Sequence, residues 1–538
     1  MSYDKKYLVW CVLVVIVLLG FMLRYYHVDY PVIGYHNWKE THYLTEARNF
    51  AREGFFKWGF FVPEYDYYQD MEGPQGQHVD TFPITSVVVA LLFLLFGVSL
   101  YVARLASIVV SVASIVMVFF VVKRLFNNEL AGLTAAALTA IMPMLVFFGR
   151  NVQLEPYALF FSLLSVWFFL RWMGEQDKFW NLFGAVVFIV AAFLVRYDHF
   201  PLLLAYAAVF PYSKLKDRKF LLKVVLCCLV ALAVPAWLLY MNNYGVAINS
   251  PMVPEGAAPA LLLQPAWWQS VTAHIIDNYS SIGFFMVLAG MVVTAFYFMK
   301  DWKNLTYRFM VGLLVGVLIW IPTAAAYLAG HSYHQFPAAI YIILMQTMFI
   351  MWITRFEKNE WKTIAVVMAI AILFFGAVVL DGTQKSTNRL FDTQFAGLDV
   401  AGKYIKDHSV RADKVMHTSG QGYGLLWSAD RKGFKLQSDV TYDVQYESQG
   451  ANWIFIYAWK FQLFGDEKFM QYLSSNYSLR QIGLQDNQPL WFLYQKGGMS
   501  NFSQTNEWAQ AHHARIVSYE RTTGPYDVIA IDDMVVFK

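Results

Sequence analysis

Residues 103–124 read ARLASIVVSVASIVMVFFVVKR. Apart from Arg104 and three serines, the residues before Lys123 are apolar, and the run ends at the basic pair Lys123 and Arg124. A helix needs about 20 mostly apolar residues to cross the hydrocarbon core of a bilayer, and Lys and Arg collect in cytoplasmic loops. The stretch therefore predicts a transmembrane helix whose C-terminal end faces the cytoplasm.

The rest of the chain divides into an apolar part and a more polar part. Of 538 residues, 58% are hydrophobic and 15% are charged, against about 25% charged in ordinary globular proteins. Residues 1–381 carry 47 charged side chains, and the much shorter stretch 382–538 carries 32. We predict a multi-spanning α-helical membrane domain over 1–381 and a soluble domain over 382–538. The net charge of +3 and the lack of a basic run argue against a nucleic-acid partner.

Apolar runs predict about eleven membrane spans, and a twelfth run, 82–97, needs a separate argument. If 82–97 does not cross, every short basic cluster falls on one side, as expected for cytoplasmic loops. We therefore place 82–97 along the outer interface of the cell membrane, with the N-terminus cytoplasmic and 382–538 extracytoplasmic. The expected spans are residues 7–24, 103–122, 130–148, 157–171, 180–195, 199–212, 220–240, 282–299, 308–328, 335–353 and 363–380.

The first outer loop, residues 25–102, contains the string HNWKETHY at residues 36–43. Read as a helix from about residue 38, this string places Glu40 and Tyr43 on one face. A carboxylate here suits a general base that faces a sugar hydroxyl, whereas the alternative is a solvated helix whose aromatic residues lie at the headgroup level. The loop also holds more acids than one active site needs, among them Asp80.

Two further outer loops add an acid and two arginines. Glu155 precedes Pro156 in the first turn of the next span, so it either takes part in catalysis or stabilises that helix end. Arg150 suits a phosphate, because its planar fork of donors matches phosphate oxygens, or else it reaches to the interface. Arg196 forms another polar cluster with Asp198 and His199.

The turn HSYHQFP, residues 331–337, places His331, Tyr333 and His334 where a late span begins. Two His three residues apart are compatible with metal ligation, but the sequence offers no third ligand. The sequence therefore leaves open whether a divalent metal takes part.

The chain has no GxxxxGK[ST] string and no convincing GxGxxG string. Chemistry on the outer side without a soluble nucleotide implies a substrate that is already activated in the membrane. A lipid-linked-sugar transporter or flippase would need ionisable residues inside the spans or an inverted repeat, and neither is evident. A non-catalytic outer-face binding protein is the other alternative, in which Glu40 and Glu155 would be dispensable.

Four strings in this order resemble the GT-C fold glycosyltransferases, and most closely the superfamily of protein O-mannosyltransferases and lipid A aminoarabinose transferases. They are HNWKETHYLTEARNF, FPITSVVVALLFLLFGVSLYVARLAS, FFGRNVQLEP and HSYHQFP, and together they extend over about 300 residues. The WWDYG-type signature of oligosaccharide transferases is absent. The resemblance implies an outer-face enzyme that moves a sugar from a polyprenyl-phosphate donor, held among the membrane lipids, to a lipid, glycan or protein hydroxyl with inversion.

The resemblance also implies roles for single residues. The family's first-loop acidic pair falls on Lys39 and Glu40, so the first of the two acids is missing here. Glu40 is therefore the expected base. Asp80, Glu46 or His42 is expected to supply part of the role of the missing acid. Glu155 would assist as the second-loop acid. The residues expected to bind the donor or its leaving phosphate are Arg150, Arg196, His331, Tyr333 and His42.

The C-terminal part is typical of an α/β domain. Residues 398–406 predict a helix, and short runs of strand-forming residues follow. The expected strands are residues 414–417, 453–457, 490–494, 515–519 and 528–531.

The predicted orientation can be tested by cysteine labelling after the three native cysteines are replaced. A cysteine at Gly420 should react with a membrane-impermeant thiol reagent in intact cells, and one at Ser213 should not. The reverse pattern would overturn the assignment of the outer side.

Overall fold

The structure is a computed structural model that describes residues 3–65, 77–78, 80–175, 178–243, 258–354, 395–418, 423–435, 451–497, 515–519 and 526–530. The chain divides into two compact units. The helical unit takes in residues 1–29 and 79–386, and the sheet unit takes in residues 30–78 and 387–538. Most of the first loop thus groups with the C-terminal residues. The domain boundary expected at 381–382 lies outside the described residues and stays a prediction.

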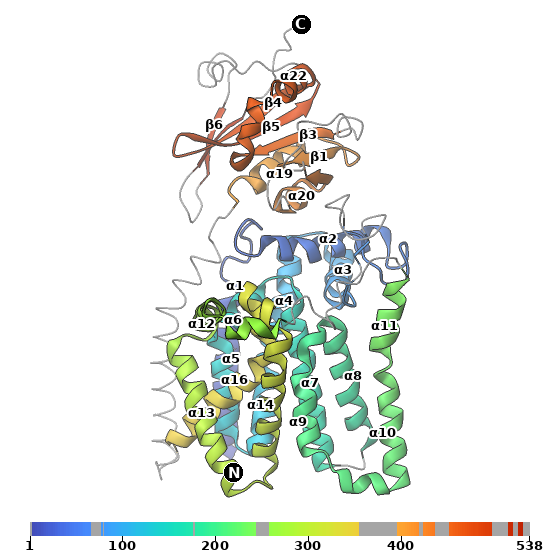
Figure 1. Ribbon diagram of the computed structural model, residues 1–538, viewed down its shortest axis with the longest axis vertical. Helices are drawn as coiled ribbons and strands as arrows, with labels where there is room; N and C mark the ends of the chain where they lie inside the picture. Colours follow the sequence, from blue (N-terminus) through green and yellow to red (C-terminus); the bar gives the residue numbers. More distant parts are fainter. Residues whose placement is uncertain are drawn as a thin grey trace. The chain divides into compact units, whose positions relative to one another are not determined.

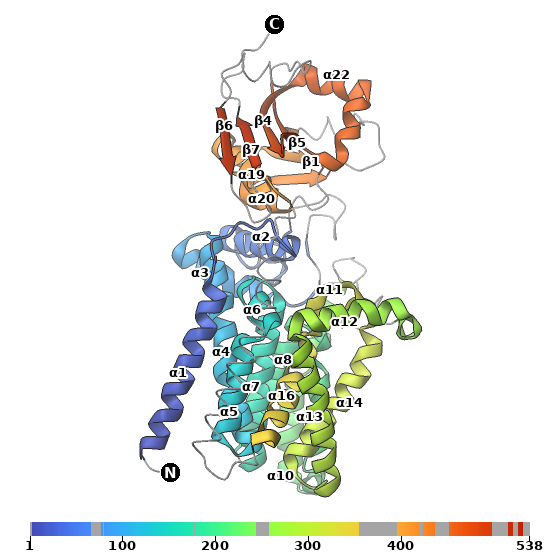
Figure 2. The same ribbon diagram turned by 90° about the vertical axis from the view of Figure 1, so that its left-hand side faces the viewer.

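The helical unit is a bundle whose long helices run side by side (Figure 1). Two shorter helices, α3 and α12, lie across one end of it (Figures 1 and 2). The α-helices are α1 (Tyr3–Tyr25), α3 (Ile84–Phe96), α4 (Leu100–Phe126), α5 (Glu129–Ile141), α6 (Pro143–Arg150), α7 (Leu154–Gly174), α8 (Phe179–Val195), α9 (Pro201–Val209), α10 (Arg218–Val230), α11 (Ala233–Asn242), α12 (Pro265–Tyr279), α13 (Ser281–Lys300), α14 (Leu305–Thr323), α15 (Ala325–Gly330) and α16 (Ala339–Thr354). The 3₁₀ helices are η1 (Tyr197–His199), η2 (Tyr212–Lys216), η3 (Pro259–Leu263) and η4 (Ser332–Ala338).

Seven helical stretches in the described part are long and apolar enough to cross a membrane, or eight if the bent pair α5–α6 is one span. This confirms a multi-pass membrane protein, whereas the count of eleven stays a prediction. The expected span 180–195 is the 17-residue apolar helix α8. The expected span 199–212 is shorter than predicted: α9 has 9 residues and ends just before the Phe210-Pro211 pair. The expected span 363–380 lies outside the described residues.

The helix α3 begins and ends at the same end of the helical unit. Before it, the Phe82 N–H donates to the Leu194 carbonyl at the C-terminal end of α8 (2.8 Å). After it, the chain turns at Gly97 and enters the first residues of α4. We call this end, where α1 also finishes, the first-loop end. The run 82–97 therefore forms a helix that does not pass to the opposite end, as the loop charges predict.

Glycines allow α14 to lie directly against α9. A Cβ on Gly312 would come within 2.6 Å of the Ala208 side chain, and one on Gly316 within 2.4 Å of the Pro201 carbonyl. Small residues four apart permit such close approach of helices in lipid, where packing rather than the hydrophobic effect drives association. The short α9 is thus held by backbone contact with its neighbour.

The sheet unit contains a seven-stranded mixed sheet in the order β2-β1-β3-β5-β4-β7-β6 (Figure 2). Strand β1 is parallel to β2 and β3, and the other pairs are antiparallel. The strands are β1 (Lys414–His417), β2 (Lys432–Lys435), β3 (Ala451–Tyr457), β4 (Tyr477–Gln485), β5 (Gln488–Lys496), β6 (Arg515–Tyr519) and β7 (Tyr526–Ala530). The helices are α2 (Asn37–Glu53), α19 (Leu398–Asp407), α20 (Tyr423–Ala429), η6 (Ala458–Gly465) and α22 (Glu467–Asn476).

Helices cover both faces of this sheet, so successive side chains along a central strand point alternately into two apolar cores. Trp453 and Phe455 of β3 pack with α19 and α20, whereas Ile454 and Ile456 pack with α22. The predicted α/β class is confirmed. The expected helix and five of the strands appear within about two residues of their predicted bounds, and β2 and β4 were not predicted.

Residues of the first loop belong to the core of the sheet unit. Ile33 is fully buried in the cluster formed with α19 and α20, and its carbonyl accepts from the Phe395 N–H (3.2 Å). The Gly424 position in α20 lies so close to the loop that a Cβ there would be 2.6 Å from the Val32 carbonyl. The catalytic loop expected at 25–102 is thus built largely onto the C-terminal fold.

The helix α2 is also fixed to α20 by a charge cluster. Arg52 donates from both terminal nitrogens to the two oxygens of Asp430 (2.6 and 2.5 Å), and Arg48 lies 2.9 Å from the same carboxylate. The Arg48 guanidinium also lies over the Trp427 ring, 5.0 Å from its centroid. Burial disfavours the Asp430 carboxylate, but the bonds from Arg52 and the charge of Arg48 outweigh it and lower the pKa of Asp430.

Asp430→Asn should therefore weaken the attachment of α2 by about 1–3 kcal/mol at neutral pH. Hydrogen exchange of α2 and α20 in the full chain is the measurement, and the exposed Asp407→Asn is the matched control. Because the folded-state pKa is lowered, the stabilisation is complete above about pH 4, the ordinary range for Asp, and disappears as pH falls below it. Equal protection of α2 in Asp430→Asn and wild type at pH 7 would contradict this account.

Candidate active site

The buried guanidinium of Arg196 connects three elements at the first-loop end of the helical unit. Its Nε donates to Asp198 Oδ1 (3.0 Å), and its Nη2 donates to the other oxygen of the same carboxylate. Its Nη1 donates to Glu155 Oε1 at the start of α7. Its Nη2 also lies 3.2 Å from His334 Nδ1 in η4. Glu155, expected as a catalytic or helix-end acid, is fully buried and bonded to Arg196.

The charges of this network favour a permanently cationic Arg196. Burial disfavours its charged form, but the carboxylates of Asp198 and Glu155 outweigh burial and raise the pKa of Arg196 above its ordinary value. A guanidinium has five N–H groups, and the bonds to the two carboxylates use three of them. The Arg196 guanidinium can therefore orient both carboxylates and still donate a hydrogen bond to a further acceptor.

The turn η4 supplies an aromatic wall beside this network. The rings of Tyr333 and His334 lie 4.3 Å apart between centroids, and those of His331 and Tyr333 stack at 5.4 Å. The turn is held from α12, because Asn278 Nδ2 donates to the Ser332 carbonyl (2.8 Å). The structure thus brings the expected residues His331 and Tyr333 to the same end as Glu155 and Arg196.

Asp80 lies beside the turn that carries Arg196. Its backbone carbonyl accepts from the Tyr197 hydroxyl (3.3 Å) and from Trp237 Nε1 (3.2 Å). Arg150 lies at the same end, but its Nη1 and Nη2 donate to the carbonyls of Tyr26 (2.7 Å) and His27 (3.1 Å), just after α1. Arg150 therefore holds the exit of α1, and its expected role toward a phosphate stays a prediction.

Glu40 and His42 belong to the sheet unit, in the first two turns of α2. Glu40 is buried, with 4% of its surface exposed, and the helix is preceded by His36 in the left-handed region (φ 58°). His42 Nε2 lies 2.8 Å from Glu46 Oε1 and 3.0 Å from His78 Nδ1. Burial first, and then the charge of His78, lowers the pKa of His42 to about 4, so its imidazole is neutral at physiological pH.

The sequence missed two of these arrangements. The contact of His334 with Arg196 joins residues 138 positions apart, and no local pattern indicates it. The approach of His78 to Glu46 spans 32 positions. The i,i+4 spacing of His42 and Glu46 within the expected helix was the one available signal for the second arrangement.

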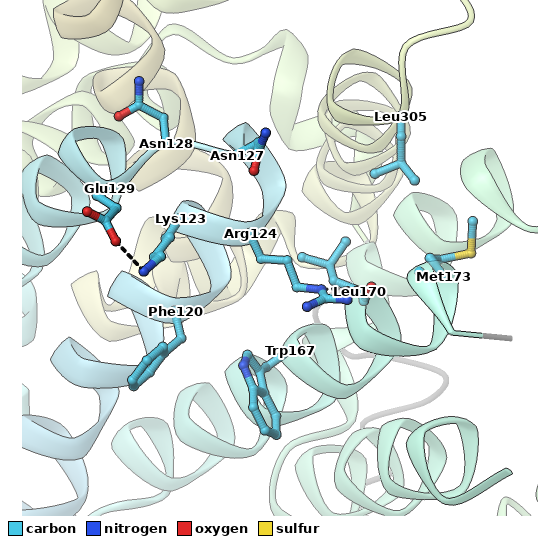
Figure 3. A pocket seen from close by; sticks show the side chains of 11 residues that line it. Phe120, Lys123, Arg124, Asn127, Asn128, Glu129, Trp167, Leu170, Met173 and Leu305 are labelled. Atoms are coloured by element: carbon cyan, nitrogen blue, oxygen red, sulfur yellow. Dashed lines mark hydrogen bonds and ion pairs between the residues drawn. The ribbon is translucent and has the colours of Figure 1, made fainter. Parts of the chain in front are cut away.

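A separate cavity of about 680 Å³ lies at the opposite end of the helical unit, between the ends of α4, α5, α7 and α14 (Figure 3). Its two cations already have partners. Lys123 pairs with Glu129 (2.6 Å), and Arg124 Nε donates to the Leu170 carbonyl (3.0 Å). None of the expected site residues lines this cavity.

Comparisons with known proteins match this architecture. Residues 80–239 match the family described as dolichyl-phosphate-mannose-protein mannosyltransferase. No curated protein matches the chain in sequence.

Solved structures extend the likeness to nearly the whole chain. The oligosaccharyltransferase AglB of Archaeoglobus fulgidus, in complex with an inhibitory peptide and a dolichol-phosphate, has a TM-score of 0.55 at 12% identity, over 92% of this chain and 75% of that one. ArnT of Cupriavidus metallidurans bound to undecaprenyl phosphate has a TM-score of 0.53 at 13% identity, over 92% and 98%. The arabinofuranosyltransferase AftD from Mycobacteria has a TM-score of 0.54 at 14% identity, over 91% and 40%. The chain has the GT-C fold of these glycosyltransferases, which confirms the resemblance found in its loops.

Proposed function

We propose that the chain is a glycosyltransferase that moves a sugar from a polyprenyl-phosphate donor to a hydroxyl group of a lipid, glycan or protein acceptor. The observation that carries the proposal is the Arg196 network, in which a buried cation orients Glu155 and Asp198 beside the η4 turn of a GT-C fold. Two of the similar proteins hold dolichol-phosphate or undecaprenyl phosphate, which supports a donor of this class here.

In the proposed reaction, Glu40 takes the proton of the acceptor hydroxyl as its oxygen attacks the anomeric carbon. The bond from that carbon to the phosphate oxygen breaks, and the electron pair leaves with the polyprenyl phosphate, so the configuration inverts. Cationic donors stabilise the charge that develops on the phosphate; we assign this role to Arg196, with Arg150 and His331 as additional donors. Tyr333 and His42 are assigned to sugar and donor contacts.

The acids Glu155 and Asp80 have distinct proposed roles. Glu155 keeps Arg196 in place and supplies negative charge beside it, because the two are bonded in a buried site. Asp80 lies in the first loop, where its backbone carbonyl accepts from the Tyr197 hydroxyl, and we assign it as the candidate replacement for the family acid that Lys39 displaces. The reaction is assigned to the outer face because the basic residues Lys123, Arg124 and Arg171 lie at the opposite end of the unit.

Glu40→Gln keeps the size of the side chain but removes the proton acceptor, so sugar transfer should fall by about 10²–10⁴-fold. Transfer is measured in membranes that contain the cell's own polyprenyl-phosphate sugars, with donor retention followed by mass spectrometry of co-purified lipid. The lipid should still be retained, because other residues hold the phosphate.

Three variants serve as comparisons for that experiment. Glu53→Gln, at the C-terminal end of the same helix, where Glu53 pairs with Lys57, should transfer normally. Glu155→Gln should lose activity to a similar degree if Glu155 shares in the chemistry through Arg196, and Asp80→Asn tests the alternative acid. Normal transfer by Glu40→Gln together with an inactive Asp80→Asn would assign the base to Asp80. Full activity in all of them would refute the proposed site.

Arg196→Lys keeps the charge but loses the fork that bonds two carboxylates and a further acceptor. Loss of one charge-assisted hydrogen bond to a phosphate corresponds to about 10–100-fold weaker binding, so less polyprenyl-phosphate lipid should co-purify. Arg171→Lys, at the opposite end of the bundle, is the control. Equal lipid retention by Arg196→Lys and wild type would exclude Arg196 as the phosphate ligand.

A further inference from the structure

His42, Glu46 and His78 direct three ligand atoms to one point in the sheet unit. His42 Nε2 lies 2.8 Å from Glu46 Oε1, His78 Nδ1 lies 2.5 Å from the same oxygen, and the two nitrogens lie 3.0 Å apart. In the part of the chain that the structure describes, no other three His, Cys, Asp or Glu residues converge so closely.

Protons alone cannot satisfy this triangle. An ionised carboxylate accepts hydrogen bonds but donates none, and a neutral imidazole carries a single N–H. If both nitrogens donate to Glu46 Oε1, the contact between the nitrogens has no acceptor. If one nitrogen donates its single hydrogen to both other atoms, the lone pair of the second nitrogen faces the carboxylate oxygen. A cation at the centre would accept lone pairs from all three atoms at once.

We propose that His42, Glu46 and His78 form a binding site for a divalent transition-metal ion, with Zn²⁺ the ion that fits best. Zinc bonds to His nitrogen at about 2.0–2.1 Å and to carboxylate oxygen at about 2.0–2.2 Å, which places tetrahedral ligand atoms roughly 3.3 Å apart. The three atoms need to separate by less than ~1 Å to reach this geometry.

The type of donor favours a transition metal. Two imidazoles and one carboxylate are a ligand set of zinc enzymes and of non-haem iron sites, whereas Mg²⁺ and Ca²⁺ prefer oxygen ligands alone. Glu46 is 1% exposed, but the two His side chains are 12% and 11% exposed. An ion therefore has a path to the site, and water can complete its coordination.

Independent contacts place the ligands before any ion binds. His42 and Glu46 are one turn apart on α2, which is fixed to α20 through Asp430. The backbone also holds His78 in place. Its backbone N–H donates to the Pro63 carbonyl (2.9 Å), and the preceding Gln77 pairs with Glu64 in a β-bridge. Asn49 of α2 in turn donates to the Glu64 carbonyl (2.9 Å). A bound ion would therefore link α2 to residues 77–78. Its ligand His42 lies within one turn of Glu40 on α2.

The test uses the purified full-length chain without a polyhistidine tag. After removal of metal with a chelator, the chain is equilibrated with Zn²⁺ and dialysed, and bound zinc is measured by elemental analysis. We expect one zinc per chain, a rise in thermal stability on zinc addition, and a visible absorption band when Co²⁺ replaces Zn²⁺. A chain that binds neither ion after dialysis would overturn the inference.

Variants assign the ion to these residues. His42→Ala, His78→Ala and Glu46→Gln should each weaken zinc binding by at least ~10–100-fold, the range measured even for outer-sphere partners. His408→Ala, at the exposed end of α19 in the same unit, should bind zinc like wild type. Unchanged zinc affinity in folded His42→Ala and His78→Ala would exclude the site, and circular dichroism establishes that the variants are folded.

The metal site does not depend on the proposed glycosyltransferase activity. Zinc bound by His42, Glu46 and His78 in a chain that transfers no sugar would refute the proposed function alone. A chain that transfers sugar but binds no zinc would refute the metal site alone.

Discussion

Four buried arginines hold the first-loop end of the helical unit together. Arg24 donates to Ser111 Oγ and to the carbonyls of Gly20, Thr139 and Ala140. Arg104 and Arg150 donate to backbone carbonyls of residues 26–28. Arg196 bonds to Glu155 and Asp198. A guanidinium away from water must have all its partners inside the protein, so these side chains determine where the helix ends can lie. The precise placement of Glu155 and η4 depends on this constraint.

The sequence revealed the parts of the fold that rest on local pattern. Long apolar runs and basic flanks predict the spans, and the β-branched and aromatic residues of 453–457 predict a strand. Other elements were hidden because tertiary contacts decide them. The nine residues of β4 include Arg480, Gln481 and Gly483, and Gly483 is required because Trp491 lies where a Cβ would be. No period in the sequence distinguishes such a strand from a loop.

The candidate site shows the same limit. The acids and cations were identifiable one by one, because carboxylates and arginines are rare in the membrane part of the chain. Their partners were not, since Arg196 meets His334 from 138 positions away, and Arg150 bonds to carbonyls at the end of α1 rather than toward open space. The type of residue indicates what chemistry a loop can perform, whereas the hydrogen-bond partners decide which loop residue is available for it.

The burial of Ile33 against α19 has a consequence for biosynthesis. The carbonyl of Ile33 pairs with Phe395, so the segment that carries Glu40 reaches its native core only after more than 350 further residues have been made. At ~5–20 residues per second, the ribosome needs roughly 20–70 s for this stretch. Contacts of such long range form late and slowly. The packing of the segment that carries Glu40 is therefore completed only after Phe395 has been made, and a chain arrested before that point cannot assemble it.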